Sequence, residues 1–228
     1  MMRYQTLLFD VDDTLFDFQA AEKQAVIHLF QDLNLPLSSE TYAYYHQLNE
    51  SLWRQYEVGQ ITRPALLVKR FHDLFAHMGH SEVDDSRAER LYRDHLAEGH
   101  ELEPDALQLI TDLKPNYELY VVTNGVAATQ RKRLADAHVN GYFENVFISE
   151  VLGAQKPEPE FFELVADQIP NFDKSKTLVI GDSLTSDIKG ANGFDLDSVW
   201  FNPNGVNNQT DTQPTYEISK LLELETIV

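Results

Sequence analysis

Leu7-Leu8-Phe9-Asp10-Val11-Asp12-Asp13-Thr14 is the stretch that decides the fold. It begins with apolar residues and changes abruptly to acidic ones, as a buried strand does at the edge of a parallel sheet. Later runs that also end in polar residues cover 119–122, 146–148, 177–180 and 198–201. Helical stretches over about 127–137, 160–168 and 186–191 separate the later runs. This alternation predicts an α/β domain with a Rossmann-like, doubly wound and mostly parallel sheet.

The segment between the first and second predicted strands has a different character. Ala21, Ala25 and Leu29 recur at helical spacing, and Thr62-Arg63-Pro64 has the form of a helix start. A helical segment of this length exceeds an ordinary crossover between parallel strands. The sequence therefore predicts an inserted all-helical cap over 17–99, and a catalytic core made of 1–16 and 100–228.

The composition limits the classes of function. Asp and Glu number 37 against 18 Lys and Arg, and the formal net charge of −19 disfavours binding to nucleic acid or to anionic membranes. Cysteine is absent, which excludes a disulfide, a thiolate nucleophile and a cysteine-ligated zinc site. No apolar run reaches the ~18 residues that a membrane helix needs. We therefore expect a cytoplasmic protein.

Polar side chains follow the predicted strands at four places. They are Asp10 and Asp12, Thr123 and Asn124, Lys156, and Asp182. Ligands of open α/β sheets bind beyond the carboxyl ends of the strands, so we expect these groups to meet at one crevice. Carboxylates brought together there need a compensating charge, which Mg²⁺ supplies because it prefers oxygen ligands. Lys156 and the Thr123 hydroxyl would add donors for phosphate oxygens.

This set of side chains suggests phosphoryl transfer. Asp10 would attack phosphorus and form an aspartyl phosphate, and Asp12 would act as general acid and then as general base. Each motif alone has a plainer interpretation, such as a turn, a helix cap or a solvated lysine. Their order along the chain, each near a strand end, favours the catalytic interpretation. Asp187 would either orient the metal shell or be a carboxylate at a helix start.

The same motifs resemble those of the haloacid dehalogenase-like superfamily of phosphatases, and the likeness spans the chain. The resemblance implies that Asp10 is the nucleophile and Asp12 the acid/base. It implies that Thr123, together with Asn124, and Lys156 bind the substrate phosphate. Asp182 would bind the metal beside the Asp10 carboxylate and the Asp12 backbone carbonyl, with Asp187 as the second acidic residue of the fourth motif. The insertion resembles the helical C1 cap of that superfamily.

Several stretches also resemble the YjjG/YfnB branch: residues 12–18, Ser149-Glu150, Gln155-Lys156-Pro157, residues 181–188 and Trp200-Phe201-Asn202-Pro203. This narrower likeness implies a 5′-nucleotidase acting on pyrimidine nucleoside monophosphates, including non-standard ones. At the metal site Mn²⁺ is an alternative to Mg²⁺. Asp12 favours a phosphatase over a dehalogenase, because the namesake dehalogenases do not need a second aspartate in that motif.

Alternative functions remain open at this point. They are a phosphatase of phosphoglycolate or a sugar phosphate, a phosphomutase or phosphotransferase, and a non-catalytic phosphate-responsive binding protein. The acid/base at Asp12 favours turnover over the last of these. Phe16 and Phe18 directly follow the catalytic loop, so we expect them to line the entrance to the cap. An aromatic ring there could stack on a base and influence substrate choice.

Overall fold

A computed structural model describes residues 3–228 of the chain. The chain forms two compact units, which we call the core unit (residues up to Phe18 together with His100–Val228) and the helical unit (Gln19–Gly99). The predicted boundary lies two residues earlier. Asp17 and Phe18 group with the core unit because the Asp17 N–H donates to the Glu101 carbonyl (3.1 Å) and the Phe18 N–H to Asp13 Oδ1 (3.1 Å).

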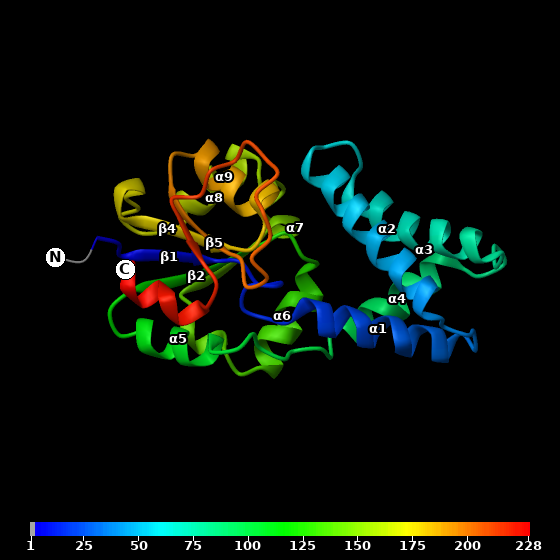
Figure 1. The fold of residues 1–228 in the computed structure, drawn as a ribbon. Helices are drawn as coiled ribbons and strands as arrows, with labels where there is room; N and C mark the ends of the chain where they lie inside the picture. The colour runs from blue at the N-terminus through cyan, green and yellow to red at the C-terminus, as the bar shows by residue number, and fades with distance from the viewer. Residues whose placement is uncertain (1–2) are drawn as a thin grey trace. The chain divides into compact units, whose positions relative to one another are not determined.

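One parallel sheet organises the core unit (Figure 1). Its six strands are β1 (Thr6–Phe9), β2 (Glu118–Thr123), β3 (Asn145–Ile148), β4 (Thr177–Gly181), β5 (Asp197–Phe201) and β6 (Tyr216–Ile218). They lie in the order β3-β2-β1-β4-β5-β6. The order reverses between β1 and β4, which is the topological switch point of a doubly wound sheet. The predicted fold class is confirmed.

Helices cover both faces of this sheet. Successive residues of a strand point to opposite faces, so neighbouring residues of β1 pack in different core clusters. Phe9 packs in a core cluster with residues of the helices on one face, and Leu8 packs in a second cluster on the other face. The first group is α5 (Ala106–Leu113), α6 (Ala127–Asp136) and η4 (Leu221–Thr226), and the second includes α8 (Pro159–Ala166) and α9 (Lys189–Gly193). Figure 1 shows the two layers on either side of the strands.

Shorter elements complete the core unit: η1 (Asn140–Tyr142), α7 (Ser149–Leu152), η2 (Lys174–Lys176) and the π-helical turn η3 (Leu184–Ile188). The helix predicted over 186–191 is therefore two elements, η3 and then α9. The strand β6 was not predicted, because an edge strand of three residues with one buried side chain leaves no apolar run in the sequence.

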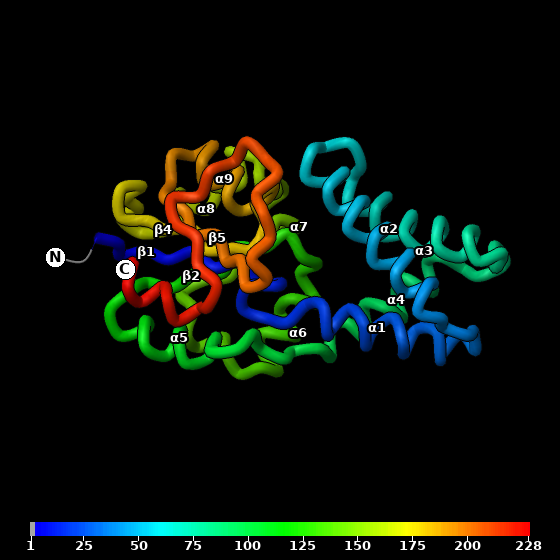
Figure 2. The backbone as a smooth tube through the Cα atoms, viewed as in Figure 1, coloured from blue at the N-terminus to red at the C-terminus, as the bar shows by residue number. Residues whose placement is uncertain are grey.

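The helical unit contains α1 (Phe18–Asp32, whose first residue belongs to the core unit), α2 (Ser39–Glu57), α3 (Arg63–Met78) and α4 (Asp85–Leu96). Figure 2 traces the chain through it and back to the core unit. Local sequence sets the helix limits. Ser38 Oγ accepts from the Thr41 N–H (3.1 Å) ahead of α2, and Gly79 ends α3 in the left-handed conformation at φ 77°.

A buried polar network joins the four helices of this unit. Glu22 of α1 accepts from Asn49 Nδ2 of α2 (2.7 Å), and Asn49 Oδ1 accepts from Arg70 of α3 (3.2 Å). Arg70 Nη2 in turn donates to Glu89 Oε2 of α4 (2.6 Å). Buried charges are costly unless they are paired, so this network restricts how the helices can pack.

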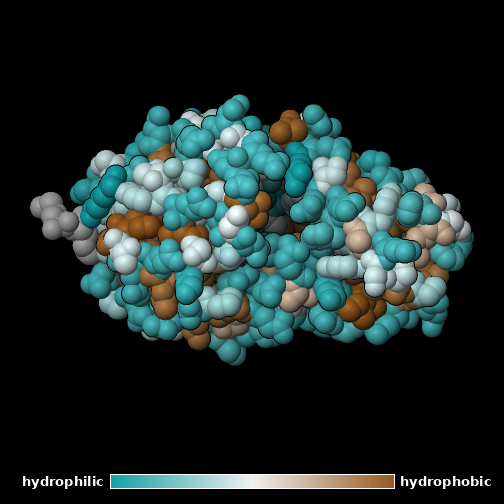
Figure 3. All heavy atoms as spheres, viewed as in Figure 1, coloured by the Kyte–Doolittle hydropathy of each residue, from teal (hydrophilic) through white to brown (hydrophobic). Residues whose placement is uncertain are grey.

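The visible face in Figure 3 is mostly hydrophilic, which agrees with the strong negative charge of the chain. None of the helices within residues 3–228 combines the length and the apolar character that crossing a membrane requires.

Candidate active site

The polar residues after β1 and β4 lie at the switch point of the sheet, where open α/β sheets bind ligands. The register pairs Phe9, the last residue of β1, with Ile180 of β4. The Asp10 N–H donates to the Ile180 carbonyl (2.9 Å), and Gly181 and Asp182 follow Ile180 directly. The two strands therefore place Asp10 and Asp182 at neighbouring strand ends.

Lys156 is a buried cation between two of the carboxylates. Its side chain is 2% exposed, and its Nζ donates to Asp10 Oδ1 (2.6 Å), Asp187 Oδ1 (2.6 Å) and the Val122 carbonyl (2.9 Å). Burial alone would lower the pKa of the ammonium, but the charges of Asp10 and Asp187 outweigh it, so the pKa is raised. All three ammonium protons have acceptors, and Lys156 stays charged.

The side chain of Asn124 positions Lys156. Its Oδ1 accepts from the Lys156 N–H (2.9 Å), and its Nδ2 donates to the Lys156 carbonyl (2.8 Å), beside the cis peptide bond to Pro157. Both ends of the Asn124 amide bind the main chain of Lys156, so the predicted contact of Asn124 with a phosphate would have to come from its main-chain N–H, and it stays a prediction. Asn124 connects the end of β2 to the lysine loop.

Three carboxylates form a cluster that can hold a cation. Asp10, Asp182 and Asp187 each offer an oxygen, and these atoms lie within 4.8 Å of one another. Burial raises the pKa of Asp10 to about 8, with Lys156 opposing the rise and Asp187 and Asp12 adding to it. Burial, Asp187 and Asp10 likewise raise the pKa of Asp182 well above its usual range. A hard divalent cation fits this oxygen-rich site, because it would offset the repulsion.

Asp187 is held at both oxygens. Its Oδ1 accepts from Lys156, and its Oδ2 accepts from the Ser183 N–H (3.1 Å). These contacts favour the role of orienting the metal shell over that of a carboxylate at a helix start. Trp200 Nε1 donates to the Asp182 carbonyl (2.7 Å) and so fixes the main chain on the other side of the cluster.

Gly181 leaves the space that Asp187 occupies. A Cβ at position 181 would lie 2.3 Å from Asp187 Cγ. We therefore expect Gly181→Ala to displace Asp187 and to lower kcat by about 10²-fold, the scale reported for a 1 Å misplacement. Gly193→Ala is the control, because a Cβ there meets nothing within 4 Å. Steady-state kinetics of both variants test this, and equal activities would contradict it.

Two residues of α6 that were not predicted as site residues bind the Asp12 carboxylate. Arg133 Nη1 donates to Asp12 Oδ1, and Gln130 Nε2 donates to Asp12 Oδ2 (2.8 Å). Arg133 is buried and lies over the ring of Phe16. Positions three apart lie on one face of a helix. The Gln-x-x-Arg spacing soon after the Thr123 motif could therefore have indicated that both side chains face the site. The Asp12 side chain is not in the carboxylate cluster, so its predicted metal contact can come only from its backbone carbonyl.

The Thr123 hydroxyl is oriented in the same network. Its Oγ1 accepts from the Gly125 N–H (3.0 Å) and from Gln130 Nε2 (3.0 Å). A hydroxyl that accepts twice still has its own proton to donate. This geometry suits the predicted contact of Thr123 with a phosphate oxygen.

The two phenylalanines predicted at the entrance to the cap differ in exposure. Phe16 is fully buried in the core cluster beneath Arg133, so the predicted stacking on a base is wrong for Phe16. The Phe16 N–H donates to the Val11 carbonyl (2.9 Å), and this tight turn directs the ring inward. Phe18 is half-buried at the first position of α1, and its role in specificity stays a prediction.

Arg133→Met tests whether the hydrogen bond from Arg133 positions Asp12 as an acid/base. We expect kcat for a nucleoside monophosphate to fall by about 10²-fold, within the range that general acid–base catalysis contributes, with little change in KM. The loss should be smaller for p-nitrophenyl phosphate, whose leaving group needs no proton, and Arg133→Lys should recover part of the activity. Equal losses with both substrates would indicate a purely structural role.

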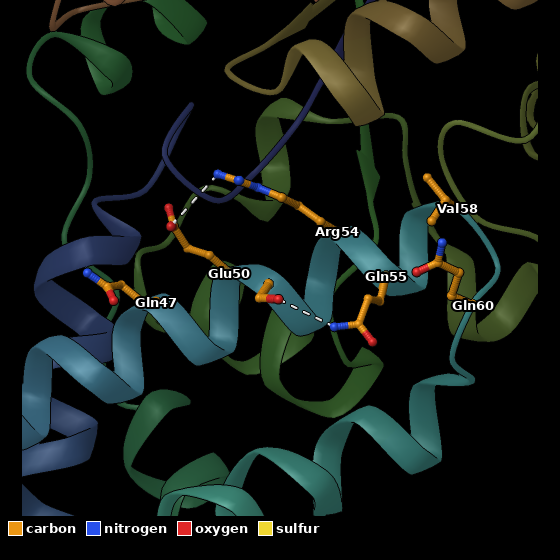
Figure 4. A pocket seen from close by; sticks show the side chains of 7 residues that line it. Gln47, Glu50, Arg54, Gln55, Val58 and Gln60 are labelled. Atoms are coloured by element: carbon orange, nitrogen blue, oxygen red, sulfur yellow. Dashed lines mark hydrogen bonds and ion pairs between the residues drawn. The ribbon is translucent and has the colours of Figure 1, made fainter.

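A separate cavity lies on the helical unit. Its volume is about 480 Å³, and it is lined by side chains of α2 and the following turn: Gln47, Glu50, Ser51, Arg54, Gln55, Val58 and Gln60 (Figure 4). Arg54 pairs with Glu50 (3.8 Å), and Gln55 donates to Ser51 (3.3 Å). The stems of these long side chains leave more apolar than polar surface in the cavity, and no group in it is placed for chemistry.

Comparison with known proteins finds relatives over the whole chain. A haloacid dehalogenase-like hydrolase family profile matches residues 4–195. The HAD-hydrolase YfnB of Bacillus subtilis is 48% identical, over 98% of this chain and 95% of that protein. The pyrimidine 5′-nucleotidase PynA of Streptococcus pneumoniae is 41% identical, over 98% of this chain and 94% of that protein. The pyrimidine 5′-nucleotidase YjjG of Escherichia coli is 29% identical, over 100% of this chain and 99% of that protein.

A solved structure shows the same similarity. A crystal structure of Bacillus subtilis YfnB, bound to magnesium, matches this chain with a TM-score of 0.95 and 47% identity over 99% of both chains. That structure reveals interdomain movement in YfnB. The matched region includes both the core unit and the helical unit of this chain.

Proposed function

Because this chain belongs to the haloacid dehalogenase-like hydrolase family, we propose that it is a Mg²⁺-dependent phosphomonoesterase that hydrolyses pyrimidine nucleoside 5′-monophosphates. The observation that carries the phosphatase proposal is Asp10, bound by the buried Lys156 at 2.6 Å within the carboxylate cluster. The substrate part rests on PynA and YjjG, which are pyrimidine 5′-nucleotidases.

The core unit supplies the groups for the first step. Asp10 carboxylate attacks phosphorus, the bond from phosphorus to the nucleoside 5′-oxygen breaks, and the phosphoryl group becomes esterified to Asp10. The Thr123 hydroxyl donates to a phosphoryl oxygen, where charge develops in the transition state. The Lys156 ammonium turns the N–H that it gives to Asp10 toward the phosphoryl group as the Asp10 oxygen bonds to phosphorus. Asp12 donates a proton to the departing oxygen, so the nucleoside leaves as a neutral alcohol.

The second step returns the enzyme to its starting state. Asp12, now a carboxylate, takes a proton from a water molecule that attacks phosphorus. The acyl phosphate bond breaks, inorganic phosphate leaves, and Asp10 is again a carboxylate. Arg133 and Gln130 hold Asp12 in a fixed orientation, so that one group can give and take a proton at the same position.

The residues fit a Mg²⁺ ion, which the carboxylate oxygens of Asp10 and Asp182 and the backbone carbonyl of Asp12 would hold. When bound, the ion neutralises charge between the carboxylates and the phosphate dianion. Mn²⁺ suits the same oxygen donors. Asp187 does not need to bind the ion directly, because both of its oxygens are already held by Lys156 and Ser183.

We assign the helical unit the role of a cap domain. It is a separate compact unit inserted between β1 and β2, and the catalytic groups lie in the core unit. Such an insertion can control the access of substrate and water to the active site without taking part in the chemistry. Phe18, at the start of α1, is the residue of the predicted pair that can still contact a substrate.

A substrate panel with and without metal tests the proposal. We expect UMP and CMP to be hydrolysed faster than AMP, GMP, phosphoglycolate and sugar phosphates, and chelation with EDTA to lower the rate by at least about 10²-fold, with recovery on adding Mg²⁺. Inorganic phosphate as the product separates hydrolysis from a phosphomutase reaction. Hydrolysis that survives EDTA would overturn the metal-dependent mechanism, and a preference for a sugar phosphate would overturn only the substrate assignment.

A further inference from the structure

A second cluster of metal-ligating side chains lies in the helical unit, apart from the catalytic carboxylates. His28 of α1, His95 near the end of α4 and Glu98 just after α4 each offer one ligand atom, and these atoms lie within 4.8 Å of one another. The two imidazole rings are 5.1 Å apart in an edge-to-face arrangement. All three residues belong to one compact unit, so their arrangement depends only on the packing of that unit.

The His95 ring has a carboxylate partner of the kind seen beside metal ligands. His95 Nε2 lies 2.8 Å from Asp32 Oδ2, and the His95 side chain is only 21% exposed. Histidine ligands usually donate their other ring N–H to a carboxylate, which fixes the tautomer and orients the ring. When Nε2–H donates to Asp32, Nδ1 keeps its lone pair for a metal. Asp32 lies one helical turn after His28, on the same face of α1.

The packing around the cluster is close. A Cβ at Gly99 would lie 2.6 Å from the Cβ of Ala21, so the segment after α4 approaches α1 directly. The Gly99 N–H donates to the Leu96 carbonyl (3.2 Å), which holds the chain in a turn beside Glu98. The half-buried rings of His28 and His95 therefore lose little freedom when they bind an ion, whereas the exposed side chain of Glu98 becomes ordered on binding.

We propose that the helical unit binds a divalent transition metal, of which Zn²⁺ is the representative, through His28, His95 and Glu98. Two imidazoles and one carboxylate suit Zn²⁺, Co²⁺ or Ni²⁺, whereas Mg²⁺ prefers oxygen ligands alone. A water molecule would complete a four-coordinate shell. The donor types therefore distinguish this site from the all-oxygen cluster of the core unit.

Metal at this site would join α1 to the chain segment that follows α4. These two segments connect the helical unit to the core unit at Phe18 and at His100. An ion that binds the folded state alone stabilises it by mass action, so Zn²⁺ should raise the unfolding temperature of the protein. This effect does not depend on catalysis, and it can be measured in a catalytically inactive variant.

Cobalt titration of the full-length protein tests the site. In Asp10→Asn protein with Mg²⁺ in excess, we expect Co²⁺ to bind with one equivalent and to give the visible absorption of a four-coordinate site. His28→Gln and His95→Gln should each weaken this binding by at least about 10²-fold. Asp32→Asn should weaken it by about 10-fold to 10²-fold, the range seen when the carboxylate that orients a histidine ligand is lost. Zn²⁺ should displace Co²⁺ and abolish the absorption.

His72→Gln is the matched control, because His72 is an exposed histidine of the same unit that pairs with Asp85 (3.0 Å). It should bind Co²⁺ as the parent protein does. Circular dichroism without metal checks that each variant is folded, and Glu98→Gln provides a further variant if a histidine change disturbs the packing. Absence of Co²⁺ binding in the parent, or equal binding by the parent and by folded His28→Gln and His95→Gln, would overturn the proposal.

Discussion

Asp10→Asn is expected to lower kcat by about 10⁴-fold or more, the scale seen when an enzymatic nucleophile is removed. The amide has nearly the shape of the carboxylate but is a far weaker nucleophile, so the variant should keep its fold and its substrate affinity. Steady-state hydrolysis of UMP measures the effect. Asp211→Asn, a change at an exposed aspartate, is the control and should leave kcat unchanged. Substantial activity in Asp10→Asn that remains sensitive to EDTA would show that another group attacks phosphorus.

The same substitution has a predictable effect on stability. The pKa of Asp10 is raised to about 8 in the folded, metal-free protein, above the ~3.9 of an unfolded aspartate. Between these values the folded state binds more protons at this group, so its contribution to stability decreases as the pH rises from about 4 to about 8. The stability of Asp10→Asn relative to the parent should therefore increase over that interval. Urea unfolding in EDTA at several pH values measures this difference, and a difference that does not vary with pH would contradict it.

The parts of the site that the sequence predicted are those that follow buried strands. Leu7-Leu8-Phe9 is apolar throughout because both faces of β1 are covered, so the end of the strand is visible as the change to Asp10. Parallel strands present their carboxyl ends at one edge of the sheet. This geometric rule is enough to bring Asp10, Lys156 and Asp182 together without knowledge of any side-chain contact.

The groups that the sequence did not reveal depend on tertiary pairing. Arg133 and Gln130 lie on a helix whose composition resembles a solvated surface, yet both side chains are buried and donate hydrogen bonds to Asp12 and Thr123. Phe16 shows the opposite case. It is adjacent to the catalytic loop in sequence, but a tight turn directs its ring into the core. Nearness along the chain therefore did not indicate nearness to the substrate.

The buried network of the helical unit could not be predicted for the same reason. Its members come from four helices: Glu22, Asn49, Arg70 and Glu89. In the sequence, each of them alone is typical of a polar position on an exposed helix face. The apolar spacing of α1 predicted a helix with a buried face, and Ala21, Ala25 and Leu29 are buried as that spacing implies. Polar residues that satisfy one another in a core leave no comparable period in the sequence.

Lys156→Met is expected to destabilise the metal-free protein by about 3–5 kcal/mol, the cost of removing one partner from a buried charge pair. The methionine occupies a similar volume but leaves Asp10 and Asp187 without the ammonium that now lies 2.6 Å from each. Without the ammonium, the three carboxyl groups of the cluster can relieve their repulsion only by taking up protons, which raises the pKa values of Asp10 and Asp182 further. We also expect kcat to fall by about 10²–10³-fold, because a donor to the phosphoryl oxygens is lost.

Magnesium provides the test that separates this electrostatic explanation from a simple packing defect. If the loss of stability comes from uncompensated carboxylates, Mg²⁺ should stabilise Lys156→Met more than it stabilises the parent, because the ion supplies the missing positive charge. Urea unfolding with Mg²⁺ and with EDTA measures this difference, and Lys220→Met, at an exposed lysine, is the control. Equal stabilisation of parent and variant by Mg²⁺ would mean that Lys156 supports the fold mainly through packing. A larger gain in the variant would show that the lysine and the metal neutralise the same group of carboxylates, and that the lysine keeps Asp10 in place before the metal and the phosphate ester bind.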